Sequence, residues 1–99
     1  MSIVLKPAQA GTLESSDIMV SIAPAPEGSG IQLDLVSAAM HQYGDHIRAL
    51  IGSILKEYGV ADAAVQANDK GAVDCVIEAR VKTAILRAAG EHFNVERIS

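Results

Sequence analysis

The 99-residue sequence contains one cysteine, no tryptophan, two tyrosines and one phenylalanine. The single thiol, Cys75, cannot form an internal disulfide, and an unpaired thiol is typical of a reducing compartment such as the cytoplasm. So few aromatic side chains do not form the stacking surface on which single-stranded nucleic acids bind. No apolar run approaches the roughly 20 residues that cross a bilayer, and residues 1–6 lack the order of a secretory signal. We therefore expect a cytoplasmic protein without a membrane partner.

Basic residues are also in the minority, with eight lysines and arginines against twelve acidic residues and a formal net charge of -4 at pH 7. This charge repels phosphate backbones, so nucleic acid is not an expected partner. No serine lies in a Gly-x-Ser-x-Gly elbow, and His41 and His46 diverge too far around a helix to share a metal ion. Cys75 borders a predicted apolar helix face, which favours a structural role. We therefore expect neither catalytic residues nor a metal site.

The length and the 49% content of hydrophobic residues fit a single domain with one core. We expect this domain to span residues 1–99, with its core within residues 10–90. Residues 91–99 show no clear periodicity and are expected to form a flexible tail.

Alternating apolar residues predict two strands, over residues 17–23 and 31–36. The intervening residues 24–30 are rich in proline and glycine, which end strands and form turns. We expect these two strands to pair as an antiparallel hairpin.

The periodicity then changes to three- and four-residue steps, which predicts an amphipathic helix over residues 38–58. Ser37 is the expected N-cap, and Gly59 is placed for a left-handed C-terminal cap. The predicted apolar face comprises Met40, Tyr43, Ile47, Leu50, Ile51, Ile54, Leu55 and Tyr58.

A weaker strand of small side chains is predicted over residues 61–67, followed by a second helix. Asn68 or Asp69 is the expected N-cap of this helix, and Gly90 is expected to end it. Its predicted apolar face comprises Val73, Val76, Ile77, Val81, Ala84, Ile85 and Ala88.

Elements with one apolar face each bury those faces by stacking in two layers. The order β-β-α-β-α therefore predicts an α+β two-layer sandwich, in which a small mixed sheet of about three or four strands is covered on one face by two helices. The strands flanking the first helix are expected to be parallel, and residues 3–5 or 11–14 are candidates for an edge strand. On the uncovered face we expect Gln32, Asp34 and Gln66 to be exposed.

The segment Gly11–Asp17, with the sequence GTLESSD, places two adjacent hydroxyls between two carboxylates. Together with Asp69–Cys75 and Glu78–Arg80, it resembles the acyl carrier subunit, or gamma chain, of citrate lyase. The resemblance extends from about Pro7 to Gly90 and involves separated motifs as well as matching length.

This resemblance implies a non-catalytic carrier whose prosthetic group, a phosphoribosyl-dephospho-CoA, is attached through a phosphodiester to Ser15, with Ser16 as the less favoured site. Its thiol would carry acetyl or citryl thioesters during the fermentative cleavage of citrate to acetate and oxaloacetate. The implied partners are the alpha subunit (citrate:acetyl-carrier transferase), the beta subunit (citryl-carrier lyase), a prosthetic-group transferase and an acetate ligase. We expect Glu14 and Asp17 to be recognition charges for the transferase that attaches the group.

Two alternatives stay open at this stage. A malonate decarboxylase carrier uses a similar prosthetic group with different partners, whereas a small α+β interaction module would carry no modification. For a carrier, we expect the loop around Ser15 to lack fixed structure.

Overall fold

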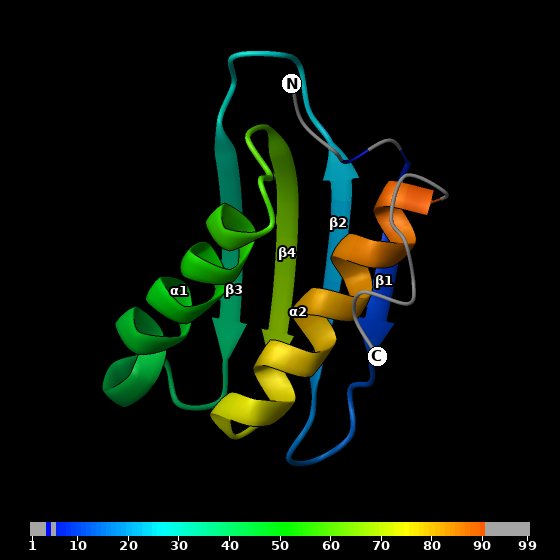
Figure 1. Ribbon diagram of the computed structural model, residues 1–99. Helices are drawn as coiled ribbons and strands as arrows, with labels where there is room; N and C mark the ends of the chain where they lie inside the picture. Colours follow the sequence, from blue (N-terminus) through cyan, green and yellow to red (C-terminus); the bar gives the residue numbers. More distant parts are fainter. Residues whose placement is uncertain (1–3, 5, 91–99) are drawn as a thin grey trace.

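The computed structural model describes residue 4 and residues 6–90. Along this part of the chain the elements are β1 (Ala8–Gly11), β2 (Ile18–Pro24), β3 (Ile31–Ser37), α1 (Met40–Glu57), β4 (Ala63–Asp69) and α2 (Asp74–Ala89). The strands form a four-stranded sheet in the order β1-β2-β4-β3. Both helices cover the same face of this sheet, with α1 against β3 and α2 against β2 and β1 (Figure 1). The predicted α+β two-layer architecture is confirmed.

The edge strand lies between the two predicted positions. Ala8–Gly11 pairs antiparallel with β2, in a register that sets Ala10 opposite Val20. Of the first candidate, residues 3–5, Val4 is outside any strand and the other two residues lie outside the described part of the chain. The second candidate, residues 11–14, is wrong beyond Gly11, because the chain leaves the sheet there to form a loop.

The predicted antiparallel hairpin between β2 and β3 is also wrong, because β4 lies between these strands. β4 pairs antiparallel with β2 and parallel with β3, as expected for strands flanking a helix. The buried carboxylate of Asp62, just before β4, accepts hydrogen bonds from the backbone N–H groups of Gly28 (3.1 Å) and Gly30 (2.9 Å). The connection from β2 to β3 is thereby held across the start of the strand that separates them.

The core lies between the sheet and the helices, and its members are mainly aliphatic. It includes Ile18, Val20, Ile22, Leu35, Ile47, Ile51, Ile54, Leu55, Val65, Ile77, Val81, Ala84, Ile85 and Ala88. Both helices begin beyond this core, so three residues of the predicted apolar faces are exposed instead: Met40, Tyr43 and Val73. On the opposite face of the sheet, Gln32, Asp34 and Gln66 are exposed as predicted.

The C-terminal ends of both helices agree with prediction. After α1, the N–H of Gly59 donates to the carbonyl of Lys56 (3.0 Å) and that of Val60 to Leu55 (2.9 Å), which is the Schellman arrangement. Gly59 and Gly90 both have positive φ, a conformation that glycine adopts without a steric penalty.

The predicted N-caps are wrong, because both helices begin several residues after the predicted capping residues. α1 has Ala39 at its N-cap and α2 has Val73. The Ser37 hydroxyl accepts from the N–H of Ala39 (3.0 Å) and donates to Asp69 (2.7 Å), while Asp69 also accepts from the N–H of Ala72 (2.9 Å). These side chains therefore join the ends of β3 and β4 rather than cap a helix.

The loop between β1 and β2 lies at the end of the sheet where β3 and β4 finish and where both helices begin (Figure 1). This end therefore brings together the connections between β1 and β2, between β3 and α1 and between β4 and α2 (Figure 1). Neither described helix combines the length and apolar character needed to cross a membrane.

Candidate functional site

The serine pair lies in a tight turn at this end of the sheet. The N–H of Asp17 donates to the carbonyl of Glu14 (3.2 Å), which places Ser15 and Ser16 at the two central positions. Ser16 has a φ of 67°, the left-handed value that the third position of a type II turn requires. Both serines are exposed. The expectation that this loop lacks fixed structure is wrong, because its backbone is hydrogen-bonded on both sides.

The turn is joined to the end of β4 by a pair of backbone hydrogen bonds. The N–H of Ser16 donates to the carbonyl of Lys70 (2.9 Å), and the N–H of Lys70 donates to the carbonyl of Asp17 (2.9 Å). These bonds continue the antiparallel pairing of β2 with β4, which ends with Ile18 opposite Asp69. Ser16 is therefore held against the sheet, whereas Ser15 lies at the free apex of the turn.

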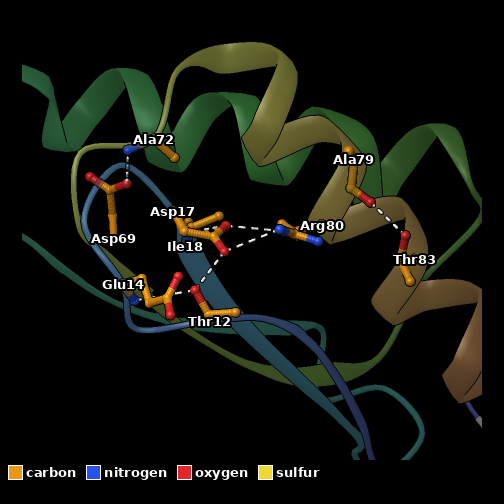
Figure 2. Close-up of polar contacts among 9 residues, drawn as sticks. All are labelled: Thr12, Glu14, Asp17, Ile18, Asp69, Ala72, Ala79, Arg80 and Thr83. Atoms are coloured by element: carbon orange, nitrogen blue, oxygen red, sulfur yellow. Dashed lines mark hydrogen bonds and ion pairs between the residues drawn. The ribbon is translucent and has the colours of Figure 1, made fainter.

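Asp17 is the centre of a hydrogen-bond network at the base of the turn (Figure 2). Arg80 of α2 donates from Nε to Oδ1 (3.0 Å) and from Nη2 to Oδ2 (3.1 Å), which is a bidentate ion pair. The Thr12 hydroxyl donates to Oδ2 (2.6 Å), and the N–H of Ile18 donates to Oδ1 (2.7 Å). The Thr12 oxygen in turn accepts from the N–H of Glu14 (3.2 Å). Both sides of the turn are thus fastened to one carboxylate.

These contacts hold the pKa of Asp17 well below that of an ordinary aspartate. The hydrogen bonds from Arg80 contribute most, followed by those from Thr12 and from the backbone of Ile18. Each of them favours the charged carboxylate over the protonated acid. Because the pKa is lower in the folded state, the carboxylate stabilises the fold at pH values above its unfolded pKa of about 4.

We expect the stability contribution of Asp17 to decline as the pH falls below about 4, because the unfolded chain then gains a proton on this carboxylate, whereas the folded chain, with its lower pKa, keeps the carboxylate charged. Urea unfolding of the wild type and of Asp17→Asn at pH 7, 4 and 3 tests this directly. The variant should be less stable than the wild type at pH 7, and the difference should shrink at pH 3. A difference that stays constant over this range would contradict the role given to the Asp17 carboxylate.

The structure separates the two acidic residues that were predicted to act alike. Glu14 is exposed, while the side chain of Asp17 is only 13% exposed and faces Arg80. Thr12 and Arg80 were not identified as parts of the site from the sequence, although Arg80 lies in one of the motifs that carry the family resemblance. Arg80 is 63 positions from Asp17, and no local pattern signals that these two residues meet.

Within the described residues, no hydrogen bond or ion pair joins the other sequence candidates to the serine turn. Cys75, expected in a structural position, is exposed because it lies in the first turn of α2, which begins beyond the sheet. His46 contacts Asp74 (2.9 Å), and both side chains are 57% exposed. Over residue 4 and residues 6–90, no group of three or more potential metal ligands is present.

The chemistry available to the turn is that of an accessible hydroxyl. Among the described residues, neither serine hydroxyl makes a hydrogen bond, so no base is placed to activate it. A serine of this kind is suited to accepting a group from another enzyme, which supplies the activating residues itself.

Comparison with known proteins first identifies the class. Residues 5–88 match the family model ACP, described as "Malonate decarboxylase delta subunit (MdcD)", which places the chain among acyl carrier proteins. The fold is similar to that of a chain in the crystal structure of a Pseudomonas malonate decarboxylase hetero-tetramer in complex with malonate. The TM-score is 0.68 with 18% sequence identity, covering 88% of this chain and 87% of that chain.

The curated relatives then identify the family. The citrate lyase acyl carrier protein of Streptococcus equi subsp. equi (strain 4047) is 52% identical over 92% of this chain and 89% of its own length. That of Lacticaseibacillus casei (strain BL23) is 47% identical, with 94% and 91% covered, and that of Albidiferax ferrireducens is 46% identical, with 89% of each covered. The chain belongs to the family of citrate lyase acyl carrier proteins.

Proposed function

We propose that this chain is the acyl carrier subunit of a citrate lyase, a non-catalytic protein modified on Ser15. The observation that carries the proposal is the identity of 46–52% to relatives that bear this name, over about nine-tenths of the chain. The malonate decarboxylase chain, the alternative carrier, is only 18% identical and supports the fold alone. The exposed, unactivated serine pair in the turn favours a modified carrier over an unmodified interaction module.

The proposed prosthetic group is a phosphoribosyl-dephospho-CoA, joined to Ser15 through a phosphodiester. When bound, it supplies the thiol on which acetyl and citryl groups are carried. The chain fits such a group because Ser15 lies at the free apex of the turn and is exposed. The beginnings of both helices lie at the same end of the molecule, where their positive dipole ends favour a nearby phosphate (Figure 1).

Ser15 is preferred to Ser16 because the two residues differ in how they are held. The backbone of Ser16 is tied to Lys70 and has a left-handed conformation, whereas no such bond restrains Ser15 within the described structure. An unrestrained apex residue can move into the active site of a transferase with less disturbance of the sheet. This difference supports Ser15 as the attachment site.

The two carboxylates of the motif have distinct proposed roles. Glu14 is exposed beside the attachment residue, so it is available as a recognition charge for a basic surface on the prosthetic-group transferase. Both oxygens of Asp17 are engaged by Arg80, Thr12 and Ile18, so Asp17 contributes to recognition by fixing the shape of the turn.

The proposed partners are the transferase and lyase subunits of citrate lyase, together with an acetate ligase that reloads the thiol. All of these reactions take place in the cytoplasm in this proposal. Carriage on a tether raises the effective concentration of the acyl group at each partner, because it does not diffuse away between two active sites. The fixed sheet and helices form the body that docks, and the prosthetic group moves between sites.

Intact-mass analysis tests the proposal. The chain, produced together with the prosthetic-group transferase and the enzymes that make its donor, should gain the mass of one phosphoribosyl-dephospho-CoA. The modified chain, once its thiol has been acetylated by the acetate ligase, should then restore citrate cleavage when mixed with citrate lyase alpha and beta subunits, but not malonate decarboxylation with malonate decarboxylase subunits. An unmodified chain that supports full citrate cleavage would refute the carrier role, and activity with the malonate system alone would favour the alternative carrier.

A further inference from the structure

Arg80 joins α2 to the sheet, and its contacts with Asp17 also bear on the shape of the serine turn. We infer that Arg80 is a positioning residue that, acting through Asp17, determines which of the two adjacent serines receives the prosthetic group. The inference rests on the proposed function, because it concerns attachment at the turn between Glu14 and Asp17. It concerns the choice between two hydroxyls that exposure alone does not separate, since both serines are exposed.

The ion pair controls the turn through the backbone of Asp17. A bidentate guanidinium fixes the orientation of a carboxylate as well as its position, and Arg80 contacts both oxygens of Asp17, at 3.0 and 3.1 Å. One of these oxygens also accepts the N–H of Ile18 at 2.7 Å, so the side chain is folded back onto the strand that follows it. The N–H of Asp17 closes the turn, so the contacts that hold the Asp17 side chain also hold the turn closed.

The left-handed conformation of Ser16 depends on this closure. A residue with a Cβ atom adopts positive φ unfavourably, so it does so only where its neighbours hold it. Ser16 is held on one side by the carbonyl of Lys70 and on the other by Asp17. Release of Asp17 would let Ser16 return to negative φ, which changes the turn type and moves both hydroxyls relative to β4.

Such a movement changes which hydroxyl reaches the transferred phosphorus. In attachment, the serine oxygen forms a bond to phosphorus while a phosphoric anhydride bond of the donor breaks. The leaving phosphate takes the bonding electron pair, and the hydroxyl proton passes to a base of the transferase. Misplacing a reacting atom by about 1 Å can lower a rate by roughly 100-fold. A change in the turn can therefore strongly alter the rates at which Ser15 and Ser16 are modified.

The experiment measures the site of attachment in folded variants. Wild type, Arg80→Gln and Arg80→Lys are modified under limiting transferase, and peptide mass mapping gives the ratio of product on Ser15 to product on Ser16. We expect Arg80→Gln to lower this ratio at least tenfold. Arg80→Lys should restore it only in part, because lysine keeps the charge but loses the planar fork.

Arg87→Gln is the matched control on the same helix. Arg87 donates to the backbone carbonyl of Gln9 (2.8 Å), so it also joins α2 to the sheet, but away from the serine turn. This variant should keep the wild-type product ratio. Circular dichroism and urea unfolding verify that each variant is folded, since a merely structural role of Arg80 would change stability and leave the ratio in the folded fraction unaltered.

Thr12→Val provides a second variant, which removes the hydrogen bond to Asp17 and the acceptor for the N–H of Glu14 but leaves the ion pair in place. It should shift the ratio in the same direction by a smaller factor. A wild-type ratio in folded Arg80→Gln would overturn the inference, whatever the result for Thr12→Val. Absence of modification in the wild type would instead refute the proposed function, so the two failures are distinguishable.

Discussion

Replacing Ser15 with alanine is expected to abolish attachment of the prosthetic group, so that the intact mass stays that of the unmodified chain. The substitution removes one exposed oxygen at the apex of the turn and no hydrogen bond within the described structure. The protein should therefore keep its stability to within about 0.5 kcal/mol. Citrate cleavage by the reconstituted complex should fall to background, because the partner subunits then lack a tethered thiol.

Ser16 provides the matched controls for this result. Ser16→Ala removes the neighbouring hydroxyl and should be modified normally. Ser16→Gly removes the hydroxyl and also the steric conflict of a Cβ atom at a φ of 67°. Relief of that conflict is offset in part by the greater freedom of glycine in the unfolded chain, so a gain of about 0.5 kcal/mol is expected. Loss of the mass adduct in Ser16→Ala, but not in Ser15→Ala, would transfer the attachment site to Ser16.

Replacing Gly11 with alanine is expected to destabilise the protein by about 3 kcal/mol or more. Gly11 has a φ of 98° at the end of β1, where the chain enters the serine loop. An added Cβ atom would lie 1.8 Å from the backbone carbonyl oxygen of Ile18. Because that oxygen belongs to the strand that anchors the turn, the collision can be relieved only by moving β1 away from β2. Urea unfolding measures the loss of stability, and the rate of attachment should fall with it.

Two other glycines separate the causes of this effect. Gly28 also has positive φ, at 88°, but an added Cβ meets nothing within 4 Å, so Gly28→Ala should cost only the backbone strain of about 1 kcal/mol. Gly52 lies within α1 and is likewise uncrowded, so Gly52→Ala should stabilise the helix by up to about 1 kcal/mol. Equal costs for Gly11→Ala and Gly28→Ala would show that the close approach to Ile18 is not the source of the effect.

The strands show which features of the fold the alternation of apolar residues predicts. The alternation at Ile18, Val20 and Ile22 predicted both the strand and its buried face, because side-chain direction in a strand follows directly from sequence position. The same alternation at Ile31 and Leu35 predicted β3 but not its neighbour in the sheet. Pairing depends on which strand reaches a free edge, and Asp62 holds the preceding connection across the start of β4.

The outcome for helix ends has a similar explanation. Gly59 was identified because a left-handed residue is a local requirement that glycine meets. The N-caps predicted at Ser37 and Asp69 are wrong, although the side chains of both residues are of the kind that caps helices. In the fold these two side chains hydrogen-bond to each other, a contact between strand ends that the sequence does not encode locally.

The sequence by itself determined the two-layer architecture, most of the residues that form its core and the motif that marks the candidate attachment turn. These follow from periodicity and from short runs of residues, whose physical consequences are local. Only the tertiary structure decided the strand order and the different environments of two carboxylates three positions apart. Glu14 is left in solvent, whereas Asp17 meets Arg80 because the folding of α2 across the sheet brings positions 63 residues apart into contact. A bidentate ion pair depends on geometry in three dimensions, which no spacing along the chain specifies.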